Sequence, residues 1–257
     1  MRAIQAFWTR PHGAALEDYM LYTMVLSALE WRKHNGEIKL VTDTDGKDYL
    51  NKRGVLCAWN EISTALDDIP QDINPKVFWA AGKIYALKCE RAPIAAIDTD
   101  FIVWERLELD NPNGIYVIHT EELDKNVYPD VEPYISFDDG FSWVQKPSNA
   151  AFYYIGNDEF IRRYTKYAEE FMKSCHEEDV LRPMVFAEQR LFSMTADKIG
   201  EKLVELSAVE SLMSVQNNTF THLWGYKSRL EKSESEKKEF SERVLNRIKR
   251  DFPDFMI

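Results

Sequence analysis

Short runs of consecutive apolar residues recur along the chain, and segments with helical spacing separate them. The apolar runs predict buried strands, and they occupy residues 4–8, 38–42, 55–59, 94–97, 115–118 and 151–155. Apolar residues at steps of three and four predict helices that begin near Leu16, Lys47, Pro75, Asp158 and Pro183. This alternation of strands and helices indicates an α/β protein with a central sheet flanked by helices.

The run at residues 94–97 is wholly apolar, which is typical of a central strand covered on both faces. It leads directly into Asp98-Thr99-Asp100. Side chains two positions apart lie on the same side of an extended chain, so both carboxylates can serve one hard cation. Because α/β proteins bind ligands at the carboxyl ends of their strands, this pair is the first candidate site, where a divalent ion could neutralise a diphosphate.

The charge of the chain limits the classes of partner. Its 257 residues carry 32 Lys and Arg against 43 Asp and Glu, a formal net charge of −11, which argues against a nucleic-acid-binding protein held by phosphate contacts. Ten acidic and two basic residues lie within 105–139 and predict an acidic, turn-rich excursion from the sheet. Residues 228–250 carry eight basic and five acidic residues, and predict a terminal helix with one core face or, alternatively, one that docks on an anionic membrane.

The three cysteines, Cys57, Cys89 and Cys175, lack the spacing of a zinc knuckle or a disulfide framework. We expect buried free thiols in a reducing cytosol. The first residues lack the apolar core of a signal peptide, and no stretch of about 20 apolar residues occurs. The sequence therefore predicts a cytoplasmic protein without a transmembrane segment, in which peripheral membrane contact would come from a partner or a surface patch.

The strand that ends in Asp98-Thr99-Asp100 resembles the DXD motif of glycosyltransferases with the GT-A fold. Three later segments resemble motifs of the family-8-like retaining branch. Residues 149–155 are similar to its Asn-Ala-Gly strand, 188–191 to its Asp-Gln-Asp segment and 221–227 to its His-x-x-Gly-x-x-Lys segment. The four segments occur in the family's order and extend the resemblance over residues 4–227. Ala151 and Arg190 replace a Gly and an Asp of the pattern, which implies a distinct branch with its own acceptor.

The resemblance implies a GT-A fold, a Rossmann-like fold of nucleotide-diphospho-sugar transferases with a mixed central sheet. It implies that residues 1–227 form the glycosyltransferase domain and that residues 228–257 form a helical extension packed on it. The implied cofactor is Mn²⁺ or Mg²⁺, bound by Asp98, Asp100 and His222. A neutral imidazole is a suitable third ligand beside two carboxylates.

The resemblance also implies catalytic and donor-binding residues. Lys227 would stabilise the departing nucleoside diphosphate, and Glu188 and Gln189 would face the donor sugar. The nucleotide-sugar would contact further residues at strand ends and in the motifs, namely Phe7, Trp8, Thr9, Asp43, Lys83, Thr99, Asn149 and Gly225. Two of these assignments have an equal structural alternative, because an adjacent Phe and Trp are also typical of a core and a helical Lys is also typical of a solvated surface.

We expect a metal-dependent glycosyltransferase that moves a sugar from a nucleotide-sugar, with a UDP-sugar as the expected donor. The acceptor would be a glycan, a lipid-linked sugar or a protein, and the resemblance implies retention of configuration. Attack from the same face, assisted by the leaving phosphate, needs no catalytic base. Inversion would instead need a positioned carboxylate, for which Asp138, Asp139 and Glu188 are candidates.

Two other functions stay open at this point. An apolar strand followed by Asp-x-Asp also supplies the nucleophile and the acid of haloacid-dehalogenase-like phosphatases, although the motif lies nearer the chain start there. A non-catalytic carbohydrate-binding protein of the GT-A fold is the second alternative. A nucleotidyltransferase is disfavoured, because no Gly-rich phosphate loop follows the first strand.

Overall fold

The computed structural model describes residues 1–128, 134, 137, 140–212 and 219–256. Its centre is a seven-stranded sheet in the order β3-β2-β1-β4-β7-β6-β8, and β5 pairs with β9 in a separate sheet. The strands are β1 (Ala3–Phe7), β2 (Ile38–Thr42), β3 (Glu61–Ser63), β4 (Ile94–Ile97), β5 (Phe101–Val103), β6 (Ile115–Val117), β7 (Phe152–Ile155), β8 (Leu203–Glu205) and β9 (Phe220–His222).

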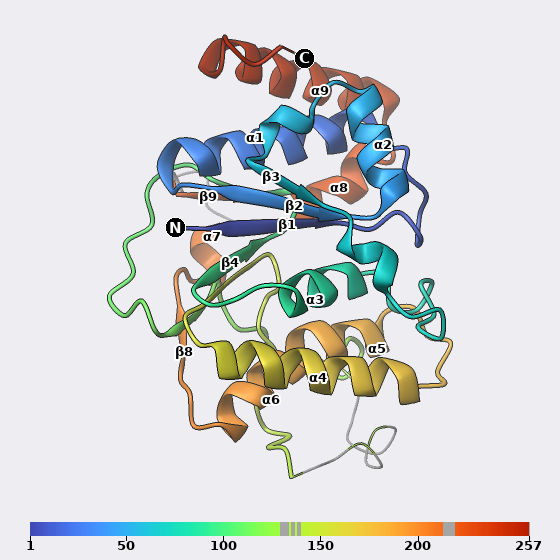
Figure 1. The fold of residues 1–257 in the computed structure, drawn as a ribbon, viewed down its shortest axis with the longest axis vertical. Helices are drawn as coiled ribbons and strands as arrows, with labels where there is room; N and C mark the ends of the chain where they lie inside the picture. The colour runs from blue at the N-terminus through green and yellow to red at the C-terminus, as the bar shows by residue number, and fades with distance from the viewer. Residues whose placement is uncertain (129–133, 135–136, 138–139, 213–218, 257) are drawn as a thin grey trace.

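Helices cover both faces of the central sheet (Figure 1). On one face lie α1 (Asp18–His34), α2 (Thr44–Lys52) and α9 (Glu234–Asp251), and on the other lie α3 (Ala81–Lys88), α4 (Asp158–Ser174), α5 (Arg182–Val185) and α6 (Leu191–Lys198). The described residues also form α7 (Val209–Leu212) and α8 (Trp224–Leu230). Each face has its own cluster of buried apolar side chains, so the sheet separates two cores.

The strand directions bring several chain segments to one edge of the sheet. β1 is parallel to both β2 and β4, whereas β7 is antiparallel to both β4 and β6. The carboxyl ends of β1, β2, β4 and β6 therefore meet at the same edge, and β7 starts there. This arrangement confirms the expected fold class, an α/β protein with a mixed central sheet flanked by helices.

The turn chemistry of the sequence explains where two of the predicted helices begin or end. Asn157 caps α4, because its side-chain oxygen accepts hydrogen bonds from the backbone N–H groups of Glu159 (2.8 Å) and Phe160 (3.3 Å). Beyond α1, Gly36 has φ +120°, and a Cβ atom there would lie 2.8 Å from the carbonyl oxygen of Met1. Only glycine fits that turn without strain.

Two element predictions are wrong. Residues 55–59 do not form a strand: Leu56–Ala58 is a 3₁₀ turn, and the third parallel strand is Glu61–Ser63. That strand lies at the edge of the sheet and is only partly buried, so it lacks an apolar run. The helix expected from Pro75 begins at Ala81 instead, because the apolar residues before it are buried from turns rather than from a helix.

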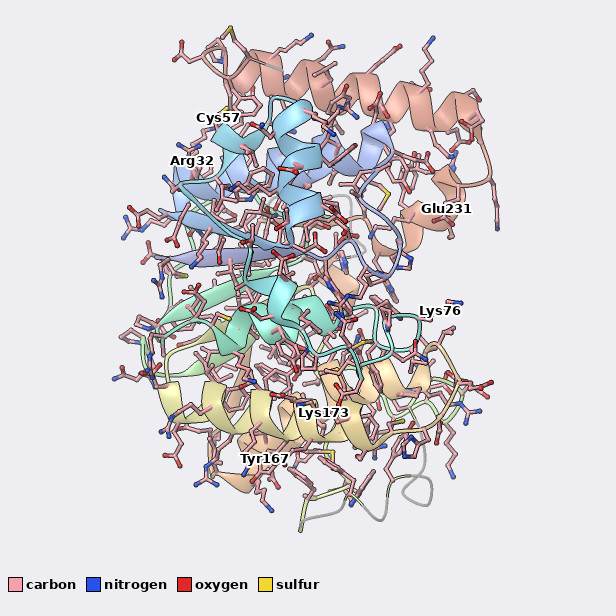
Figure 2. The ribbon with its side chains drawn as sticks, turned by 45° about the vertical axis from the view of Figure 1, so that its right-hand side comes forward. Arg32, Cys57, Lys76, Tyr167, Lys173 and Glu231 are labelled. Atoms are coloured by element: carbon pink, nitrogen blue, oxygen red, sulfur yellow. The ribbon has the colours of Figure 1, made fainter. Side chains whose placement is uncertain are left out.

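The expectation of buried thiols is also wrong. Cys57 and Cys89 are exposed, Cys175 is partly exposed, and all three are free. Figure 2 shows Cys57 at the surface beside Arg32, whose Nη1 donates a hydrogen bond to the carbonyl oxygen of Cys57 (2.7 Å). The polar backbone of this turn is thereby tied to α1, and its thiol stays outside the core.

The C-terminal helix α9 packs on α1, with Val244 and Ile248 buried and most other side chains exposed or partly exposed. The helix therefore presents one apolar face to the core. α8 extends across residue 227, so the expected division between domain and extension at that position stays a prediction. No helix in the described part of the chain has the length and apolar character needed to cross a membrane.

Candidate functional site

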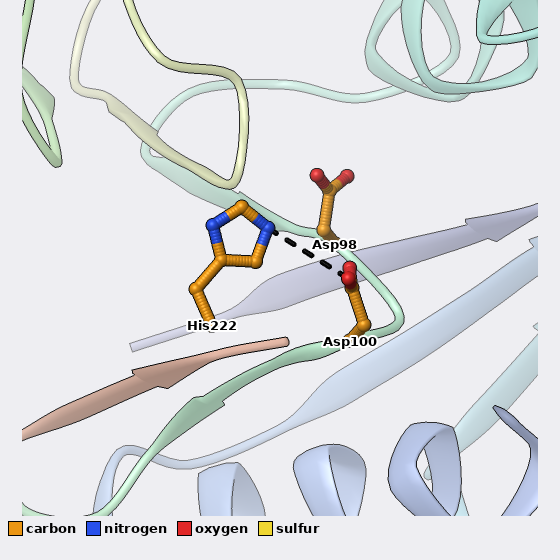
Figure 3. A group of neighbouring side chains, drawn as sticks. All are labelled: Asp98, Asp100 and His222. Atoms are coloured by element: carbon orange, nitrogen blue, oxygen red, sulfur yellow. Dashed lines mark ion pairs between the residues drawn. The ribbon is translucent and has the colours of Figure 1, made fainter. Parts of the chain in front are cut away.

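Asp98, Asp100 and His222 gather at the carboxyl edge of the sheet (Figure 3). One ligand atom from each side chain lies within 4.8 Å of the others. Asp98 follows β4 directly, and Asp100 precedes β5, whose residue Phe101 pairs with His222 of β9. The backbone N–H of Leu223 also donates to the carbonyl oxygen of Asp100 (3.1 Å), so pairing of β5 with β9 places the histidine beside the two carboxylates.

The protonation states of this cluster suit a divalent cation. Burial would raise the pKa of Asp100, but the positive charge of Lys227 and its hydrogen bond oppose this, and the pKa is held below its usual value. Burial lowers the pKa of His222, which favours the neutral imidazole. Two carboxylates and a neutral imidazole are the donor set expected for a borderline ion such as Mn²⁺. The residues present therefore fit the metal that the sequence predicts.

Lys83 lies buried beneath Asp98, not on a solvated helix face. Its ammonium contacts Asp98 Oδ1, Glu188 Oε1 (2.8 Å) and the carbonyl oxygen of Ala150 (2.7 Å). Burial alone would lower the pKa of Lys83, but the charges of Asp98 and Glu188 outweigh it and raise the pKa. An ammonium has three hydrogens, and these contacts engage all three. Binding of phosphates by Lys83 stays a prediction.

Glu188 reaches this lysine from a π-helical turn, Phe186–Arg190, between α5 and α6. Such turns are rare and are frequently found at functional sites. The hydroxyl groups of Tyr153 and Tyr164 both donate to the carbonyl oxygen of Glu188, at 3.0 and 2.9 Å, and fix the turn. Burial raises the pKa of the Glu188 carboxyl, Lys83 opposes this, and Asp98 adds to it. Lys83 thus links Glu188 to Asp98 of the candidate metal site.

Lys227 approaches the cluster from α8, and Gly225 lies in the first turn of the same helix. Lys227 Nζ lies 2.7 Å from Asp100 Oδ2, and His222 Nε2 lies 3.7 Å from the same oxygen. A Cβ atom built at Gly225 meets no atom of the described chain within 4 Å. Packing within the protein therefore does not require glycine at this helical position, whereas a ligand that approaches the backbone would.

Asn149 and Gln189 lie at the same edge with partners that the sequence did not identify. Asn149 Nδ2 donates to Glu121 Oε1 (2.8 Å), and Gln189 Oε1 accepts from the hydroxyl of Tyr128 (2.7 Å). His119 holds the same Glu121 oxygen at 2.9 Å, and its hydrogen bond is the main reason that the pKa of Glu121 is lowered. The sequence contained a signal for these residues, because His119 directly follows the apolar run 115–118, at the edge of the sheet where β4 also ends.

The residues at the ends of β1 and β2 bind one another. Asp43 Oδ2 accepts hydrogen bonds from the backbone N–H and the hydroxyl of Thr9, both 2.8 Å, and Asp43 Oδ1 accepts from the N–H of Gly46 (2.9 Å). Asp43 is thus the N-terminal cap of α2. Phe7 and Trp8 are buried in the two cores, and base stacking by either ring stays a prediction.

Three further candidates complete the set. Thr99 is half-buried in the turn between Asp98 and Asp100, and its contact with a ligand stays a prediction. Asp138 and Asp139, the carboxylates considered for an inverting reaction, lie outside the described residues.

The comparisons with known proteins give a family and a set of distant structural similarities. The fold and the cluster define an α/β protein with a candidate metal centre at the carboxyl edge of its sheet. The chain belongs to a family of unknown function, DUF6734, whose sequence model matches residues 1–256. No curated protein matches the chain in sequence.

Solved structures that the chain resembles include three glycosyltransferases. A galactosyltransferase, LgtC, in complex with donor and acceptor sugar analogues, is 13% identical over 74% of this chain and 71% of its own, with a TM-score of 0.42. The glycosyltransferase GlyE of Streptococcus pneumoniae TIGR4 is 13% identical over 79% of this chain and 44% of its own (TM-score 0.45). Mouse xyloside xylosyltransferase 1 is 12% identical, over 80% and 84% (TM-score 0.42).

Proposed function

We propose that this protein is a metal-dependent glycosyltransferase that moves a sugar from a nucleotide-sugar, with UDP-sugars as the donor class. The supporting observation is the cluster of Asp98, Asp100 and His222 at the carboxyl edge of the sheet, with one lysine beside each carboxylate. Three acidic side chains, Asp98, Asp100 and Glu188, lie close to two lysines, Lys83 and Lys227. Bringing so many charged groups together opposes folding, and such clusters are typical of functional sites.

Each residue of the cluster has a distinct role in this proposal. Asp98, Asp100 and His222 would hold Mn²⁺ or Mg²⁺, which supplies positive charge to a leaving diphosphate. Lys227 would donate a charge-assisted hydrogen bond to the same diphosphate. Lys83 would act as a positioning residue, since its contacts fix Asp98 and Glu188 relative to each other.

The reaction exchanges one bond at the anomeric carbon of the donor sugar. The oxygen of an acceptor hydroxyl forms a bond to that carbon, and the bond from the carbon to the diphosphate oxygen breaks. We propose retention, in which attack occurs on the face that the diphosphate leaves and the hydroxyl proton passes to the leaving phosphate. Glu188, Gln189 and Asn149 would border the donor sugar, and the acceptor would be a glycan, a lipid-linked sugar or a protein. Three free cysteines support a cytoplasmic location for this reaction.

The direct test is release of nucleoside diphosphate from a panel of UDP-, GDP- and CDP-sugars, with and without Mn²⁺ and with glycan acceptors. We expect metal-dependent release from UDP-sugars, and a loss of at least about a hundredfold in Asp100→Asn, because a metal supplies several kcal/mol of charge stabilisation. Asp110→Asn, at an exposed loop position, is the matched control and should keep full activity.

Two results would contradict the proposal. Equal turnover in Asp100→Asn and Asp110→Asn would remove the metal role of the cluster. Release of inorganic phosphate from phosphate esters, without release of nucleoside diphosphate from any sugar nucleotide, would indicate the phosphatase alternative.

A further inference from the structure

The two carboxylates of the candidate metal centre are each paired with a lysine, and the two lysine side chains differ in how easily they can move. The side chain of Lys83 is 10% exposed and engages Asp98, Glu188 and a backbone carbonyl. The side chain of Lys227 is 34% exposed, and within the described residues its ammonium contacts the single carboxylate of Asp100. Lys83 cannot leave without exposing buried charge to an apolar interior, whereas Lys227 can turn toward solvent on its flexible stem.

Lys227 occupies an oxygen that a metal would need. Asp100 Oδ2 lies 2.7 Å from Lys227 Nζ and 3.7 Å from His222 Nε2, so the lysine and the histidine meet at one carboxylate oxygen. A divalent cation held there by Asp100 and His222 would bring a second positive charge close to the ammonium, and like charges repel strongly away from bulk water. The observed position of Lys227 therefore opposes metal binding at this oxygen.

We propose that Lys227 supplies the positive charge beside Asp100 until a divalent metal binds there. Lys227 then leaves Asp100 and pairs with the nucleoside diphosphate, which couples the binding of the metal to the binding of the nucleotide. This inference rests on the proposed function. Without nucleotide, a metal must break the ion pair between Lys227 and Asp100 with no new partner for the lysine. With nucleotide present, the released ammonium gains a phosphate, and the metal and the nucleotide favour each other's binding.

The exposure of α8 agrees with such a movement. The side chain of Lys227 is 34% exposed, and the buried residue of this helix is Leu230, at its far end.

The experiment measures Mn²⁺ affinity by calorimetry for the wild-type chain and for Lys227→Met, first alone and then with saturating UDP. We expect Lys227→Met to bind Mn²⁺ alone more tightly than the wild type by at least about fivefold, the lower end of typical coupling between sites. The same variant should bind UDP more weakly in saturating Mn²⁺, because the lysine no longer reaches the phosphate. These two changes have opposite signs, whereas a purely structural role would weaken both affinities.

Two controls keep the result interpretable. Lys232→Met removes an exposed charge just after α8 and should leave both affinities unchanged, and Lys227→Arg keeps a cation and should bind Mn²⁺ alone no more tightly than the wild type. If the wild type binds Mn²⁺ and UDP but Lys227→Met binds Mn²⁺ alone no more tightly, the coupling role of Lys227 is wrong and the proposed function stands. If the wild type binds no Mn²⁺ with or without UDP, both proposals fail.

Discussion

The carboxyl edge of the sheet has two halves that treat their polar residues in opposite ways. At the ends of β1 and β2, Asp43 accepts three hydrogen bonds from Thr9 and Gly46, so its charge is satisfied by donors of the fold itself. At the ends of β4 and β9, Asp98, Asp100 and Glu188 lie together with two lysines and a histidine. The first half is explained by helix capping, whereas the second concentrates like charges that folding alone would avoid. An acidic residue at a strand end thus indicates a functional site only when helix capping does not explain its position.

The largest expected effect concerns the buried lysine of the charged half. Lys83→Met leaves Asp98 and Glu188 facing each other without a countercharge, and we expect a loss of about 3–5 kcal/mol in the free energy of unfolding. Denaturant unfolding followed by circular dichroism measures this loss. Lys88→Met, on the same helix, breaks a more exposed ion pair with Glu169 and a cation–π contact with Tyr85, and should cost about 0–1 kcal/mol. Equal stability of the two variants would show that the buried charges do not depend on Lys83.

A smaller effect is expected at the ends of β1 and β2. Asp43→Ala removes the cap of α2 and leaves buried donors of Thr9 and Gly46 without an acceptor, which should cost about 2–3 kcal/mol of stability. Its Mn²⁺ affinity should equal that of the wild type. Asp45→Ala, in the exposed first turn of the same helix, serves as control for both readouts. A variant that keeps its stability but loses nucleotide binding would instead place Asp43 in the donor site, as the sequence predicts.

The smallest expected effect concerns Gly225 and tests whether this residue belongs to the ligand site proposed at the ends of β4 and β9. Gly225→Ala should leave stability unchanged or raise it by up to about 1 kcal/mol, since alanine is the better helix former and its Cβ meets no described atom. Nucleotide affinity, measured by calorimetry with Mn²⁺, should fall by about tenfold, which equals the loss of one hydrogen bond to a charged group. Unchanged affinity would put Gly225 outside the ligand site.

Much of this edge was predictable, because the rules involved are local. A wholly apolar run before Asp98 identified the central strand and the carboxyl edge of the sheet, where we propose the ligand site, and the same rule applied to residues 115–118 would have found His119 and Glu121. The three-residue strands β5, β8 and β9 are too short to show a period, so the pairing that brings His222 to Asp100 rested on the family resemblance.

Other features of the site depend on contacts between distant segments. Lys83 meets Glu188 across 105 positions of sequence, and nothing in the spacing of α3 distinguishes this buried lysine from the exposed Lys88. The π-helical turn that presents Glu188 is held by the hydroxyls of Tyr153 and Tyr164, which belong to β7 and α4. Burial and tertiary hydrogen bonds decide such features, and they do not follow from local pattern.

The central claim is that the cluster of Asp98, Asp100 and His222 binds a metal together with a nucleoside diphosphate. The most direct measurement is the thermal unfolding midpoint of the wild-type chain with UDP, GDP and CDP, each with and without Mn²⁺, since a ligand that binds only the folded state raises the midpoint. We predict a rise with UDP that requires Mn²⁺ and that is absent in Asp100→Asn. A midpoint that no nucleotide changes, with or without the metal, would contradict the claim.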